Sequence, residues 1–110
     1  FLKKINLKDF KLTFRSKYRA ADIEYKKGSL VPGGMFEISK SDEKKLDIYE
    51  DYPILYKKYY FNYQKKQIMT YTMVKKTSFM FPTEKYLNII KKGYIDCNLD
   101  TIHLKNALKY

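Results

Sequence analysis

Glu50 is the side chain best placed for proton-transfer chemistry in this sequence. Ser39 and Asp42 have the spacing of a helix capping box, and Pro53 stops a helix shortly before it. A helix over residues 41–50 is therefore expected, with Glu50 at its C-terminus. A helix dipole disfavours an anion at that end, which raises the pKa of a carboxyl group there and makes Glu50 a candidate general base.

The surroundings expected for Glu50 follow from its distance to Leu46. The two residues are four apart and share one helix face, and Leu46 is the natural apolar anchor of that face. Apolar surroundings would raise the pKa of the Glu50 carboxyl further. Judged by residue type alone, the simpler interpretation of Glu50 is a hydrated glutamate at a helix end, which is the more common case.

Other catalytic and metal-binding chemistries have little support in this sequence. Its one histidine, His103, and its one cysteine, Cys97, cannot build a metal site, so no metal is expected. The sequence has no phosphate-binding glycine-rich loop, and its serines lack the motif of an activated nucleophile. Catalysis would therefore depend on one carboxylate.

The elements that must position this helix begin with strands. Apolar and polar residues alternate over residues 7–15, which is typical of a half-buried strand. Residues 20–25 and 30–38 are predicted to be two further strands, joined by a turn at residues 26–29.

The second half of the chain predicts two more strands and two helices. The strands cover residues 55–63 and 68–74, with apolar residues on both faces, which is expected where a sheet curls into a barrel. A helix begins near Pro82, and its predicted buried stripe consists of Tyr86, Ile89, Ile90 and Tyr94. Leu104 and Leu108 anchor a short last helix. The prediction is an α+β fold, a small mixed β-barrel with peripheral helices, in a single domain over residues 1–110.

The charge of the chain is strongly positive. The 110 residues carry a formal net charge of +11, which is compatible with attraction to polyanions. All but two of the 23 positive side chains are lysines, the exceptions being Arg15 and Arg19, whereas nucleic-acid sites favour arginine. Because the lysines are also spread along the chain, a nucleic-acid partner is not favoured.

The expected compartment is the cytoplasm. No apolar run approaches the roughly 20 residues that a membrane-spanning helix needs, so no membrane association is predicted. A signal peptide is not recognisable, and the single Cys97 cannot form an internal disulfide, which is typical of a reducing environment.

The stretch around Glu50 resembles the LDxxEG segment of the gamma-glutamylcyclotransferase-like family, whose members include avirulence-induced-gene-type proteins. Leu46, Asp47 and Glu50 occupy the matching positions, while Asp51 stands where the family usually has glycine. Tyr56 and Tyr86 match two tyrosines that the family places in its substrate pocket, and the resemblance extends from about residue 7 to residue 108. A tyrosine taken alone is more often a packing or surface ring than a ligand contact.

The resemblance implies a reaction that needs neither cofactor nor water. The catalytic glutamate of the family corresponds to Glu50 of this chain. In the family's reaction, this glutamate takes a proton from the α-ammonium group of a small γ-glutamyl substrate. The freed amine attacks the γ-carbonyl, and 5-oxoproline and an amine are released. Such chemistry would class the protein as a cofactor-free lyase or acyltransferase, with Tyr56 and Tyr86 binding the substrate.

The family's opening strand and its YGSN loop are absent from these 110 residues. Since backbone amides of that loop hold the substrate carboxylate and the oxyanion, we expect a pocket open on one side and an unpaired sheet edge. The alternative interpretation, favoured by this absence and by Asp51, is a non-catalytic binding or regulatory member of the same fold.

Overall fold

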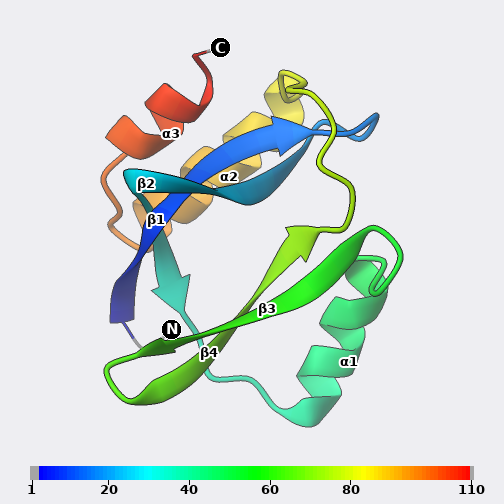
Figure 1. Cartoon of the computed structure of the whole chain (residues 1–110), viewed down its shortest axis with the longest axis vertical. Helices are drawn as coiled ribbons and strands as arrows, with labels where there is room; N and C mark the ends of the chain where they lie inside the picture. The colour runs from blue at the N-terminus through cyan, green and yellow to red at the C-terminus, as the bar shows by residue number, and fades with distance from the viewer. Residues whose placement is uncertain (1–2, 110) are drawn as a thin grey trace. The chain divides into compact units, whose positions relative to one another are not determined.

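The computed structural model describes residues 3–109, which form two units, each containing one antiparallel hairpin. The first unit comprises Phe1–Glu37 and Thr77–Tyr110, and the second comprises Ile38–Lys76. The elements follow in the order β1, β2, α1, β3, β4, α2 and α3 (Figure 1). The predicted α+β class is therefore confirmed, while the single domain over residues 1–110 stays a prediction.

The first unit is built on the long hairpin of β1 (Lys3–Arg15) and β2 (Ala20–Met35). The two strands pair antiparallel, with Arg15 opposite Ala20 at the closed end and Lys3 opposite Met35 at the open end. β1 begins at Lys3, four residues before the predicted start of this strand. β2 runs without a break from Ala20 to Met35, where the sequence pattern predicts two strands.

The turn predicted at residues 26–29 is wrong, and the structure has a bulge there. The register shifts between Lys8 and Phe10, so that residues 26–29 of β2 lie opposite the one residue Asp9. Asp9 and Gly28 both have positive φ, 63° and 87°, and the Gly28 N–H donates to the Asp9 carboxylate over 2.9 Å. Glycine and aspartate are typical of turns and of such bulges, so local composition does not separate the two.

Two helices complete the first unit. α2 (Glu84–Asp96) begins at the N-cap Thr83, and α3 (Ile102–Ala107) follows it (Figure 1). A buried cluster joins both helices to β1 and consists of Phe14, Leu87, Tyr94 and Leu104. The predicted buried stripe of α2 is correct for Tyr94, but Ile89 is 62% exposed and Leu87 takes its place in the core.

The second unit consists of α1 (Lys40–Tyr49) and the hairpin of β3 (Tyr56–Tyr63) and β4 (Lys66–Met73). Gln64 and Lys65 both have positive φ and connect the strands in a two-residue turn, so the two strands predicted here are confirmed and pair as a hairpin. Lys58 pairs with Tyr71, and Tyr56 pairs with Met73, which places these four residues on one face of the hairpin.

The predicted closed barrel is wrong for residues 3–109. The strands there form two separate two-stranded sheets, β1 with β2 and β3 with β4. A barrel requires each strand to pair on both sides, and no strand does so within the described residues. The apolar residues on both faces of β3 are mostly tyrosines, whose hydroxyl group allows a ring to remain at the surface, as for Tyr60 at 51% exposure.

Candidate active site

The helix that carries Glu50 has the predicted start and end. The Ser39 hydroxyl accepts the Asp42 N–H over 3.0 Å, and the Asp42 carboxylate accepts the Ser39 N–H over 3.4 Å, which completes the capping box. Glu50 is the C-cap, and its N–H donates to the Leu46 carbonyl over 2.8 Å. Glu50 is half-buried, and this burial raises the pKa of its carboxyl group.

The chain leaves α1 through a Schellman motif. The Asp51 N–H donates to the Ile48 carbonyl over 3.2 Å, and the Tyr52 N–H donates to the Asp47 carbonyl over 2.9 Å. These are the two hydrogen bonds of that motif, whose first residue after the cap has a left-handed backbone and is usually glycine. Asp51 occupies that position with φ of 52°. The backbone around Glu50 is therefore fixed by hydrogen bonds on both sides of it.

A polar network joins α1 to the β3–β4 hairpin at Lys58. The Lys58 ammonium contacts the Glu43 carboxylate at 2.6 Å and the Asp47 carboxylate at 3.1 Å. The Tyr71 hydroxyl donates to Oδ1 of the same Asp47 carboxylate over 2.6 Å. Lys58 also lies over the Tyr52 ring, 4.5 Å from its centre. We call Asp47, Lys58 and Tyr71 the lock, because these three side chains connect all three elements of the second unit.

The electrostatics of the lock are those of matched charges. The hydrogen bond from Tyr71 lowers the pKa of Asp47, and Lys58 acts in the same direction. The hydrogen bond to Glu43, followed by Asp47, raises the pKa of Lys58. Burial, followed by Asp47, raises the pKa of Tyr71. Near neutral pH, Asp47 and Lys58 are charged and Tyr71 keeps its proton, which is the state in which all three contacts form.

Tyr56 lies at the same end of the second unit as Glu50. It is the first residue of β3, and its side chain is buried, with 7% exposed. The connection from Glu50 is short, and it is held by hydrogen bonds from the Ile54 and Leu55 N–H groups to the Asp51 carbonyl. Glu50 and Tyr56 therefore stand on the two sides of one tight connection, and the assignment of Tyr56 to the substrate pocket stays a prediction.

Tyr86, the third predicted site residue, belongs to the first unit. Its hydroxyl oxygen accepts the Ala21 N–H of β2 over 3.1 Å, and its ring meets Phe14 edge to face at 6.4 Å between centres. These contacts give Tyr86 a packing role in the first unit. Its assignment to the substrate pocket stays a prediction.

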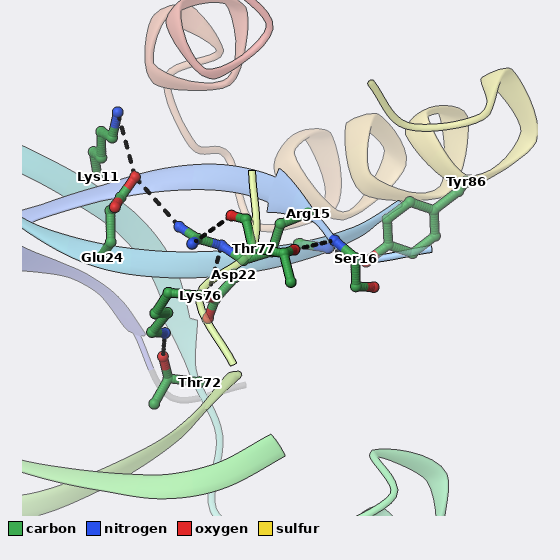
Figure 2. Close-up of polar contacts among 10 residues, drawn as sticks. Lys11, Arg15, Ser16, Asp22, Glu24, Thr72, Lys76, Thr77 and Tyr86 are labelled. Atoms are coloured by element: carbon green, nitrogen blue, oxygen red, sulfur yellow. Dashed lines mark hydrogen bonds and ion pairs between the residues drawn. The ribbon is translucent and has the colours of Figure 1, made fainter. Parts of the chain in front are cut away.

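A second polar cluster occupies the first unit, around Arg15 (Figure 2). The buried guanidinium of Arg15 lies 3.1 Å from the buried Asp22 carboxylate and 3.3 Å from Glu24, and it donates to the Thr77 carbonyl over 3.0 Å. The Thr77 hydroxyl also accepts the Ser16 N–H over 2.9 Å. Arg15 lies in the first segment of this unit and Thr77 is the first residue of its second segment. The cluster therefore holds the two segments of the unit together where the second one begins.

Sequence reasoning did not identify Lys58 and Tyr71. A weak signal was present in the sequence, because the strand alternation puts Lys58 on the same face as Tyr56 and Tyr60 and so places a lysine among aromatic residues. The structure adds that Tyr71 is its partner on the neighbouring strand. Among residues 3–109, no three His, Cys, Asp or Glu side chains are grouped closely enough to hold a metal ion. None of the helices in that range is long and apolar enough to cross a membrane.

A family model described as gamma-glutamyl cyclotransferase, AIG2-like, matches residues 1–94. This range includes Glu50, Tyr56 and Tyr86, as well as both hairpins and nearly all of α2. No curated protein and no solved structure matches the chain.

Proposed function

The chain belongs to the AIG2-like gamma-glutamyl cyclotransferase family, and on that basis we propose that it cyclises small γ-glutamyl amines or peptides to 5-oxoproline. The observation that carries the proposal is the state of Glu50. This carboxyl group ends α1 in the predicted position, is half-buried, and has a pKa raised by that burial. A raised pKa brings a glutamate closer to the pH at which a general base works best.

In the proposed reaction, the Glu50 carboxylate takes a proton from the α-ammonium group of the substrate. The freed amine attacks the γ-carbonyl carbon, and a five-membered ring forms as the carbonyl oxygen becomes an oxyanion. The bond to the leaving nitrogen then breaks while Glu50 returns its proton to that nitrogen. The ring nitrogen, which still carries two hydrogens after the attack, gives up one of them, and this proton also ends on the released amine. The nucleophile is already attached to its electrophile, so the protein has to orient the two groups, move protons and stabilise the oxyanion.

The proton balance of this reaction leaves Glu50 unchanged. Of the three hydrogens on the substrate's α-ammonium group, one remains on the ring nitrogen of 5-oxoproline. The other two leave on the departing amine, which is released as an ammonium ion. No oxidant, reductant, metal or water is consumed, so the proposed reaction needs no cofactor.

Two tyrosines are proposed to contact the substrate. Tyr56 is supported by its place beside the connection that follows Glu50 and by its burial. Tyr86 is supported by its place in the segment that resembles the family. Its hydroxyl oxygen already accepts the Ala21 N–H, so the proposed substrate contact would have to keep or replace this hydrogen bond.

The test is release of 5-oxoproline from a panel of γ-glutamyl dipeptides and γ-glutamyl amines, with Glu50→Gln as the matched control. Glutamine keeps the shape of the side chain but cannot accept the proton, so turnover by this variant should fall below detection while the fold is retained. Equal turnover by the variant would refute the role of Glu50. Substrate binding without turnover in the unaltered chain would instead support a non-catalytic member of the family, which is the alternative favoured by Asp51 at the usual glycine position.

A further inference from the structure

We infer that Asp47 is a positioning residue for Glu50, and that it acts through the lock with Lys58 and Tyr71 by fixing the end of α1 on the β3–β4 hairpin. The inference rests on the proposed function only for its effect on turnover, because its effect on the Glu50 carboxyl can be measured without any reaction. It assigns a task to the aspartate that lies three residues before the glutamate in the LDxxEG segment.

Three acidic residues follow one another along one face of α1. Glu43, Asp47 and Glu50 are separated by four and three residues, so they follow one another on one helix face. The first two contact Lys58, at 2.6 and 3.1 Å, so this face turns toward β3. Glu50 is the next residue on the same face, and its orientation depends on the contacts one turn before it.

Lys58 contacts the chain on both sides of Glu50. Asp47 lies three residues before Glu50, and the Tyr52 ring lies two residues after it. Both contact the same ammonium group, Asp47 at 3.1 Å and the ring centre at 4.5 Å. A single cation therefore restrains the segment that carries Glu50 at both of its ends.

The three side chains of the lock hold one another in place. The Lys58 side chain is only 12% exposed and that of Asp47 22%, so the pair is more shielded than an ordinary surface ion pair. Tyr71 is directly opposite Lys58 in the hairpin register, and its hydroxyl donates to Asp47 over 2.6 Å. Asp47 thus accepts from both strands, and loss of one contact alters the other.

The experiment compares four variants of the whole chain, Asp47→Asn, Lys58→Met, Tyr71→Phe and, as the matched control, Lys57→Met. Lys57 is the neighbouring lysine on the opposite strand face and is exposed, so its replacement removes the same charge without touching the lock. The first readout is the pKa of the Glu50 carboxyl, followed by carbon-13 NMR. The second is kcat and KM for release of 5-oxoproline from a γ-glutamyl dipeptide.

The sign of the pKa change separates positioning from simple charge effects. The titratable groups around this corner are Glu43 and Asp47 on α1, Asp51 and Tyr52 after it, and Tyr56, Lys58 and Tyr71 on the hairpin. Removing the Lys58 cation by itself would raise the pKa of Glu50, because a nearby positive charge favours the anion. Release of the helix end would give Glu50 more water and lower its pKa. We expect a lower pKa in Lys58→Met than in Lys57→Met.

The same lowering is expected in Tyr71→Phe, which changes no charge and removes one hydroxyl group, so this variant decides the matter if Lys58→Met fails to fold. In the lock variants, kcat should fall about 100-fold with KM much less affected, as expected when a catalytic group is misplaced by about 1 Å. A Glu50 pKa in Lys58→Met and Tyr71→Phe equal to or above that of Lys57→Met would overturn the inference. If the unaltered chain releases no 5-oxoproline, the proposed function fails, and the NMR titration still decides whether the lock positions Glu50.

Discussion

Replacement of Asp51 by glycine should stabilise the chain, although it removes a side chain. Asp51 has φ of 52° at the Schellman position after α1, where a side chain crowds the backbone. A residue with a Cβ atom pays about 1–2 kcal/mol in this conformation, and glycine loses about 0.5–1 kcal/mol more backbone entropy than alanine on folding. Glycine should therefore be about 1 kcal/mol more favourable than alanine here, with the aspartate between them, because aspartate enters this region more readily.

Thermal and urea unfolding of Asp51→Gly, Asp51→Ala and the unaltered chain would measure this order. In a chain of 110 residues, 1 kcal/mol corresponds to a shift in Tm of about 4 °C, which is easily resolved. The control is the same pair of substitutions at Lys45, an exposed position inside α1. There the backbone is right-handed, so Lys45→Gly should be about 1 kcal/mol less stable than Lys45→Ala.

The reversed order at the two positions is the essential result. If Asp51→Ala is as stable as Asp51→Gly, the backbone at residue 51 is not left-handed, and the helix does not end as described. If glycine is preferred as expected, the aspartate at this position is a modest local cost that the rest of the second unit tolerates. That result would also explain, in physical terms, why the family usually has glycine directly after the glutamate.

Three further predictions test the core, the buried ion pair and the pH dependence of Glu50. Leu104→Ala should lower the free energy of unfolding by about 2–5 kcal/mol, whereas Ile89→Ala, at an exposed site of α2, should change it by less than about 0.5 kcal/mol in chemical denaturation. Arg15→Met should destabilise by about 3–5 kcal/mol because it removes the buried guanidinium that contacts the buried Asp22 carboxylate, and the added Asp22→Leu substitution should recover much of that loss in the same assay. Because burial raises the pKa of Glu50, the folded state favours the protonated carboxyl and loses this stabilisation as the pH rises through that pKa. Glutamine does not ionise, so Glu50→Gln does not lose stability in this way. The Tm of the variant minus the Tm of the unaltered chain should therefore be larger at pH 8 than at pH 4, and a difference independent of pH would contradict the raised pKa.

Several features of the second unit could be predicted because they depend on neighbours in the sequence. The capping box joins Ser39 to Asp42, three residues away, and the helix ends at Glu50, shortly before Pro53. The turn at Gln64 and Lys65 likewise needs only local backbone geometry. Hydrogen bonds of this kind form within a few residues, and the pattern that specifies them is visible in the chain itself.

The first unit shows where local patterns fail. Lys26, Lys27, Gly28 and Ser29 have turn composition, yet they form a bulge because Asp9, on the other strand, accepts the Gly28 N–H. Ile89 fits the apolar stripe of α2 but is exposed, because the partners of that helix, Phe14 and Leu104, meet it at Leu87 and Tyr94. In both cases the outcome depends on a segment that is distant in the sequence.

The sequence by itself determined the helix that carries Glu50, the position of Glu50 at its end, and the mixed α+β class, since these follow from caps, breakers and periodicity. Only the tertiary structure decided that the strands form two separate hairpins and that Asp47 is held by Lys58 and Tyr71, 11 and 24 residues away. Such pairs form only after strand register has brought their backbones together, and many lysines and tyrosines of this chain offer the same chemistry. Residue type therefore limits which contacts can form, and the packing of α1 on the β3–β4 hairpin selects the ones that do.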